Sequence, residues 1–62
     1  MKEIDVIQIK KELNKYVVKS PLATRVDVIN RTIMLVEDAG FAEIPLELLK
    51  FVMAIPLEVN VI

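Results

Sequence analysis

Residues 19–22, which read Lys-Ser-Pro-Leu, divide the first part of the chain into two helices. The residue before a proline avoids helical backbone angles, so a preceding helix is expected to end by Lys19 or Ser20. Serine is also a preferred N-cap, and proline is a preferred first residue of a helix. The sequence therefore predicts that one helix ends and the next begins here. The short link favours antiparallel neighbours.

On the N-terminal side of this stretch, apolar residues recur at steps of three and four, the spacing of one helix face. They are Val6, Ile9, Leu13, Tyr16 and Val17. This pattern predicts a helix over about residues 3–19. The β-branched residues near the start would also suit a strand, so a strand is the alternative prediction for residues 3–9.

On the C-terminal side, residues 21–39 are expected to form the second helix. Asp27 and Arg31 are four residues apart and are expected to form a surface ion pair. Gly40 is the only glycine, and it is expected to cap this helix in the left-handed conformation. The predicted buried stripe consists of Leu22, Val26, Ile29, Ile33 and Val36, widened by Val28, Leu35 and Ala39.

Pro45 is expected to begin a third helix over residues 45–55, by the same first-turn preference. This segment is apolar nearly all round, and Glu47 and Lys50 are its charged members. Such a helix is normally buried on several sides, so we expect another molecule to cover part of it. The alternative is a central helix that the other two helices and the tail wrap.

The tail, residues 56–62, begins at Pro56 and alternates apolar and polar residues as a strand does. It would pair with residues 4–9 or with the tail of a neighbouring chain, or else lie over the core as an irregular strap. The sequence thus predicts a mostly α fold. Residues 1–62 are expected to form one small three-helix domain with an extended tail that is either a strand or an irregular strap.

The composition favours association with other molecules. The chain has 62 residues, of which 55% are hydrophobic, and it contains neither cysteine nor histidine. Small domains usually need disulfides, a structural metal or a partner subunit for stability. Without the residues for the first two, we expect a homo-oligomer, with a dimer first. A well-packed monomeric helical bundle is the alternative.

Charge is unevenly spread along the chain. Residues 1–31 hold seven basic and four acidic side chains, whereas residues 32–62 hold one basic and five acidic, for a net charge of −1. This polarity would orient two chains relative to each other or present a basic face to an acidic partner. The acidic total argues against strong general attraction to nucleic acid.

The residue inventory argues against an enzyme. Nucleophilic catalysis needs an activated nucleophile beside a base, but the chain has one serine, two threonines and no histidine. One glycine cannot form a glycine-rich phosphate loop. We therefore expect no catalytic, cofactor-binding or metal-binding residues, and no cofactor.

Nucleic-acid binding is the main competing interpretation. The second helix, Gly40 and the third helix imitate a helix–turn–helix layout, but the would-be recognition helix offers only Lys50 as a base. The alternative is a small nucleic-acid-binding regulator whose phosphate contacts are Lys10, Lys11, Lys15 and Lys19. A membrane-surface role for the first helix ranks third.

The favoured prediction is a small accessory protein that binds other proteins and acts in the cytoplasm, without a transmembrane segment. Its partner is a second copy, a larger protein, or both. Its role would be assembly, adaptor action or inhibition. The predicted contact residues are Leu46, Leu49, Phe51, Val52, Met53, Leu57, Val59 and Val61.

Overall fold

The computed structural model describes residues 3–57, which form three helices: α1 (Val6–Lys19), α2 (Arg25–Asp38) and α3 (Leu46–Ala54). Helices account for 67% of the described residues, and none of these residues lies in a strand. The mostly α prediction is therefore confirmed. The strand alternative for residues 3–9 is wrong, since residues 6–9 are helical. Residues 58–62 of the predicted β tail lie outside the described residues.

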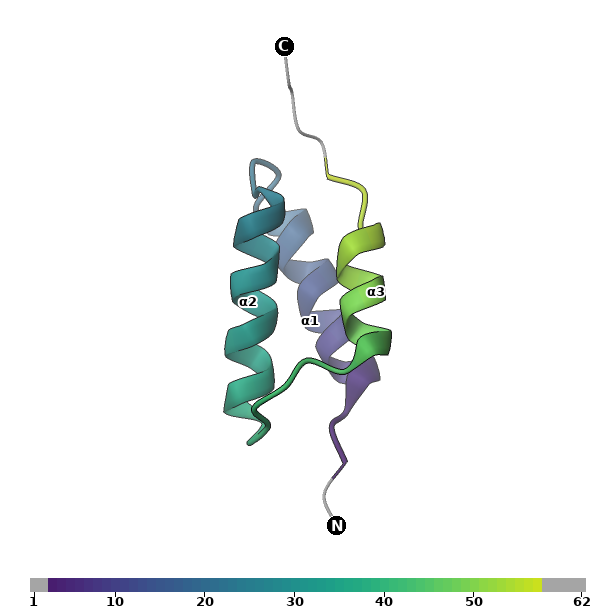
Figure 1. The fold of residues 1–62 in the computed structure, drawn as a ribbon. Coiled ribbons are helices and arrows are strands. Elements are labelled where there is room, and N and C mark those ends of the chain that lie inside the picture. The colour runs from purple at the N-terminus through teal and green to yellow at the C-terminus, as the bar shows by residue number, and fades with distance from the viewer. Residues whose placement is uncertain (1–2, 58–62) are drawn as a thin grey trace.

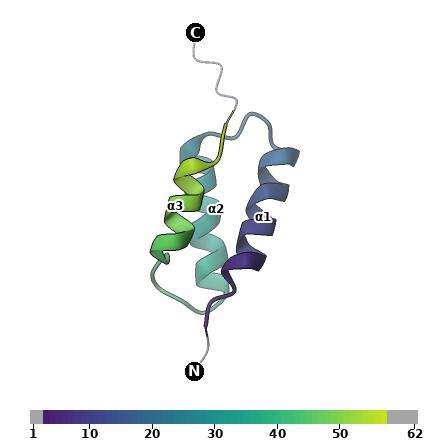
Figure 2. The same cartoon turned by 90° about the vertical axis from the view of Figure 1, so that its right-hand side faces the viewer.

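Each helix contacts the other two, and α2 runs opposite to α1 and α3. Figure 1 looks onto the side where α2 and α3 lie in front of α1. Figure 2 shows α1 and α3 side by side with α2 behind them. The antiparallel arrangement of α1 and α2 agrees with the short link that the sequence places between them.

The ends of α1 follow from local hydrogen bonds. The carboxylate of Asp5 accepts a hydrogen bond from the backbone N–H of Gln8 over 3.0 Å, and this cap satisfies one of the free donors of the first turn. The helix therefore begins at Val6, three residues later than predicted. It ends at Lys19, as predicted from the serine–proline pair, and Ser20 N–H donates to the Tyr16 carbonyl.

The predicted start of α2 at Pro21 is wrong. Pro21 and Leu22 lie in a turn, and the helix begins at Arg25 behind a capping box. In that box the Asp27 backbone N–H donates to the Thr24 hydroxyl over 3.2 Å, while the Thr24 backbone N–H donates to the Asp27 carboxylate over 2.9 Å. The box therefore satisfies two backbone N–H donors at the start of the helix. A serine N-cap followed by proline offers no such reciprocal pair of hydrogen bonds.

The predicted end of α2 is confirmed. Gly40 has φ of 90°, and its N–H donates to the Glu37 carbonyl. The N–H of Phe41 donates to the Val36 carbonyl, and these two bonds together form a Schellman motif. After the connecting loop, Pro45 occupies the N-cap of α3, and the helix is one residue shorter than predicted at each end.

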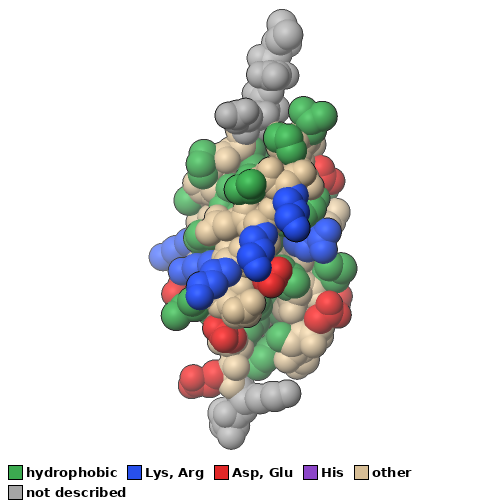
Figure 3. Space-filling view, turned by 180° about the vertical axis from the view of Figure 1, so that it is seen from behind, with side chains coloured by type: hydrophobic (Ala, Val, Ile, Leu, Met, Phe, Trp, Pro, Cys, Tyr) green, Lys and Arg blue, Asp and Glu red, His purple; other side chains and the backbone are tan. Residues whose placement is uncertain are grey.

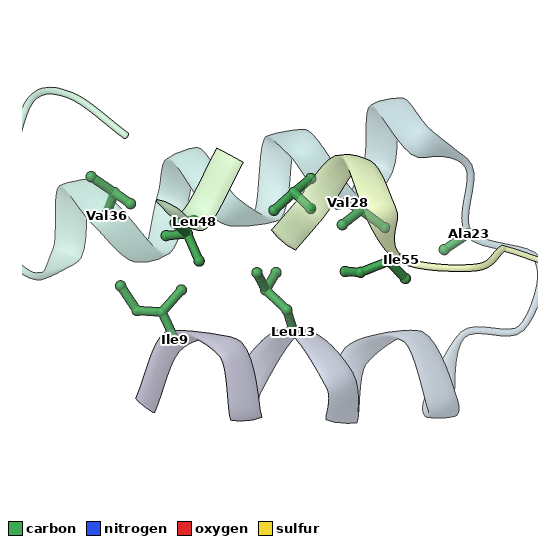
Figure 4. Close-up of a cluster of buried hydrophobic side chains, with 8 residues drawn as sticks. Ile9, Leu13, Ala23, Val28, Val36, Leu48 and Ile55 are labelled. Atoms are coloured by element: carbon green, nitrogen blue, oxygen red, sulfur yellow. The ribbon is translucent and has the colours of Figure 1, made fainter. Parts of the chain in front are cut away.

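The core lies along the common axis of the three helices. Figure 4 shows Ile9 and Leu13 of α1 pointing toward side chains of α2 and α3. The buried apolar side chains are Ile9, Leu13, Ala23, Val28, Val36, Leu48, Val52 and Ile55. Thr32 is buried among them, and its hydroxyl donates to the Val28 carbonyl of its own helix over 2.8 Å.

The predicted buried stripe of α2 is wrong for three of its members. Leu22, Val26 and Ile33 are 86%, 63% and 39% exposed. The helix instead buries Val28, Thr32 and Val36, at steps of four. Apolar residues cover more than one side of α2, so spacing alone does not fix its rotation. Thr32 enters the core because its own helix satisfies its hydroxyl.

Candidate interaction surfaces

An exposed apolar surface runs along one side of the bundle, over α2 and α3. We call it the α2–α3 face, and its members are Val26 and Ile33 of α2 with Leu46, Leu49 and Met53 of α3. The α2 members are seven residues apart, and the α3 members are three and four apart. Each set therefore shares one side of its helix. This side of the molecule faces the viewer in Figure 1.

A hollow of about 520 Å³ joins the two helices of this face. Ile33 of α2 and Leu49 of α3 both line it, which shows that the exposed rows of the two helices meet. Ala42 and Ile44 of the connecting loop extend the apolar lining, while Glu37 and Glu43 add carboxylates at its margin. The hollow thus combines apolar side chains of both helices with two carboxylates.

The predicted contact residues of α3 divide into two groups. Leu46, Leu49 and Met53 are exposed, at 65%, 39% and 55%. Val52 is 1% exposed and belongs to the core, so its prediction as a contact residue is wrong. Its position four residues after Leu48 places both on the inner side of α3, a register that the nearly uniform apolar sequence hides.

The other predicted contact residues lie away from this face or outside the described residues. Phe51 is partly buried against the core, and the Lys10 ammonium lies 5.3 Å from the centre of its ring. Leu57 is also partly buried against the core. Val59 and Val61 lie outside the described residues. Sequence reasoning missed Val26 and Ile33 as surface residues because it assigned their stripe to the core.

The four lysines predicted for phosphate contacts do not form one row. Lys10 turns toward α3, where its ammonium lies 3.4 Å from a carboxylate oxygen of Glu47. Lys15 and Lys19 line a hollow between α1 and α2. Lys11 is exposed. It does not line this hollow and it does not pair with Glu47. Figure 3 shows Lys and Arg side chains in a band across the α1 side.

The hollow between α1 and α2 is a second candidate surface, with a volume of about 350 Å³. We call it the α1–α2 hollow, and it is lined by Glu12, Lys15, Tyr16, Lys19, Ser20, Arg31 and Leu35. The guanidinium carbon of Arg31 lies 4.5 Å from the centre of the Tyr16 ring, a cation–π contact between the two helices. Sequence reasoning missed Arg31 because it assigned this residue to an ion pair.

That expected ion pair between Asp27 and Arg31 is wrong for the described structure. The Asp27 carboxylate belongs to the capping box, and the only ion pair within residues 3–57 joins Lys10 and Glu47. The hydrogen bond from the Thr24 backbone N–H lowers the pKa of Asp27, and the Thr24 side chain lowers it further. Thr24 thus holds the carboxylate that Arg31 was expected to engage.

Within residues 3–57, no three His, Cys, Asp or Glu side chains lie close enough together to hold a metal ion. None of the three helices has both the length and the apolar content that crossing a membrane requires. Comparison with family models, curated proteins and solved structures gave no significant match to the chain.

Proposed function

We propose that this protein is a non-enzymatic interaction module that pairs with a second copy of itself through the α2–α3 face. The observation that carries the proposal is the exposure of five large apolar side chains on one side of two adjacent helices. Scattered exposed apolar residues are ordinary, but a contiguous group bordered by charges is typical of a protein interface.

The charges at the margins of this face support a second copy as the partner. Glu37 lies on the α2 side and lines the same hollow as Leu49, so the two are at the same level of the bundle. Lys50 follows Leu49 on the α3 side. A two-fold axis parallel to the helices would place α2 of each copy against α3 of the other. Glu37 of each copy would then lie near Lys50 of its mate.

The available surface is sufficient for such a pair. A stable interface buries about 800 Å² on each partner, and the accessible surface of this protein is 4860 Å². An interface of that size would take about one sixth of the accessible surface of each copy. In this pair, α2 of each copy would lie antiparallel to α3 of the other. The four helices would pack as a bundle, a common arrangement of amphipathic helices.

The test is the molar mass of the purified protein, measured by sedimentation equilibrium over a wide concentration range. We expect reversible dimerisation that Met53→Lys weakens at least tenfold. Val18→Lys is the matched control, because Val18 is 79% exposed near the C-terminal end of α1 and lies outside the face. A wild-type protein that stays monomeric throughout, or equal effects of the two variants, would contradict the proposal.

A further inference from the structure

We propose that the α1–α2 hollow binds a small phosphorylated ligand, such as a diphosphate group, through Lys15, Lys19 and Arg31. The three cations come from two helices and line one hollow. They lie on a different inter-helix face from the proposed dimer contact. The proposals of ligand binding and of dimerisation can therefore be tested independently.

The local charge of the hollow differs in sign from that of the whole chain. Three cations and one carboxylate, that of Glu12, line it, whereas the chain has a net charge of −1. The Glu12 carboxylate already accepts a hydrogen bond from the Gln8 side chain over 3.3 Å. Among the described residues, neither Lys15, Lys19 nor Arg31 takes part in an ion pair. The hollow thus keeps an excess of positive charge.

Arg31 is the residue best prepared for an anion. It is partly buried, it is held against the Tyr16 ring, and no described residue accepts a hydrogen bond from its guanidinium. A guanidinium presents five N–H donors in a planar fork that matches two phosphate oxygens. Arg31 lines the hollow and makes no hydrogen bond or ion pair with another described residue, so its donors remain for an oxyanion.

The rest of the hollow suits a small ligand with more than one acidic oxygen. Lys15 and Lys19 are four residues apart on α1, so both ammonium groups can reach the same side. Tyr16 and Ser20, whose hydroxyls are further donors, also line it. A volume of about 350 Å³ is at the small end of the range for ligand pockets.

A nucleic-acid backbone fits these observations less well. Tracking successive phosphates needs a continuous row of cations. Lys10 does not extend the cations of the hollow into such a row, because its ammonium turns to the α3 side, 3.4 Å from a Glu47 carboxylate oxygen and 5.3 Å from the centre of the Phe51 ring. Lys15 and Lys19 line the α1–α2 hollow together with Arg31, which favours a compact ligand.

The test is titration of the ¹⁵N-labelled protein with pyrophosphate, followed by amide chemical shifts at two salt concentrations. We expect saturable shifts centred on residues 15–20 and 31, and an affinity that Arg31→Gln lowers about tenfold through loss of a charge-assisted pair. The matched control is Lys11→Gln, which removes an exposed cation of α1 outside the hollow and should leave the affinity within twofold.

Three results would overturn the proposal. The first is the absence of saturable shifts with pyrophosphate. The second is an equal effect of Lys11→Gln and Arg31→Gln, which would indicate diffuse attraction to surface charge. The third comes from a parallel titration with a single-stranded oligonucleotide. Much tighter binding, with a steep salt dependence and shifts that extend to Lys10 and Lys11, would identify a nucleic-acid surface instead.

Discussion

The guanidinium of Arg25 donates a hydrogen bond to the backbone carbonyl of Val52 over 2.6 Å, which joins the first residue of α2 to the last turns of α3. Carbonyls in the last turn of a helix lack the intrahelical partner that others have. The N–H of Ile55 approaches the same oxygen at 3.4 Å. Arg25 therefore links the start of α2 to the end of α3.

Replacing Arg25 with methionine should lower the free energy of unfolding by about 1–2 kcal/mol, because a partly buried carbonyl loses a charged donor while the apolar stem remains. Urea denaturation followed by circular dichroism measures the change. Lys11→Met removes an exposed cation and should change stability by less than about 0.5 kcal/mol. Equal losses in the two variants would show that the contact contributes nothing specific.

The same substitution at two threonines should act in opposite directions. Thr32→Val replaces a buried hydroxyl that bonds only to its own helix, so we expect stability to rise by about 1 kcal/mol. Thr24→Val removes the cap of α2 and should lower stability by about 1 kcal/mol. Thermal unfolding of both variants beside the wild type tests the pair. A loss at position 32 would mean that the hydroxyl has a role in the core beyond this one bond.

Acidification should weaken the start of α2. The pKa of Asp27 is lowered in the folded state, so its stabilising effect is fully present above the ordinary carboxyl pKa of about 4. That effect is lost as the pH falls through the depressed folded-state value. The stability difference between the wild type and Asp27→Ala should therefore shrink between about pH 5 and pH 2. A difference that stays constant over this range would show that the ionised form carries no advantage.

Gly40→Ala should lower stability by about 1 kcal/mol. No heavy atom lies within 4 Å of the position that a Cβ would take, so the cost comes from the positive φ alone. Gly40→Asn should cost less, because asparagine tolerates the left-handed region better than alanine does. Chemical denaturation of both variants tests this order. Equal losses would point to a cause other than backbone conformation.

The two-fold arrangement predicts a charge-swap pattern at the margins of the α2–α3 face. Glu37→Lys and Lys50→Glu should each weaken dimerisation, because each single change places like charges opposite one another. The double variant should recover most of the lost affinity. Sedimentation of the three variants at low salt measures this. Additive weakening in the double variant would rule out the proposed pairing of Glu37 with Lys50.

The features that the sequence predicted correctly depend on local chemistry. The end of α1 at Lys19 follows from the proline two residues later, and the end of α2 follows from Gly40. The start of α2 was missed because the prediction rested on the serine–proline pair and did not include a box formed by Thr24 and Asp27. Both signals lie within four residues of each other, and only the hydrogen bonds distinguish them.

The rotation of α2 depends on partners that are distant in sequence. The contact of Arg25 with Val52 spans 27 positions, and no periodicity reveals it. The sequence predicted that Leu46, Leu49 and Met53 lie on the surface. It did not predict this for Val26 and Ile33, because the rotation of α2 was not known. The dimeric state and the protein-binding role stay predictions.

The capping box has a consequence beyond helix initiation. By holding Asp27, Thr24 keeps an internal competitor away from Arg31, since an unrestrained carboxylate four residues earlier would reach the guanidinium and occupy it. A change at Thr24, which does not line the α1–α2 hollow, should therefore weaken the anion binding proposed for Arg31. Through this one threonine, the hydrogen bonds that start α2 also engage the carboxylate that lies four residues before the proposed anion-binding arginine.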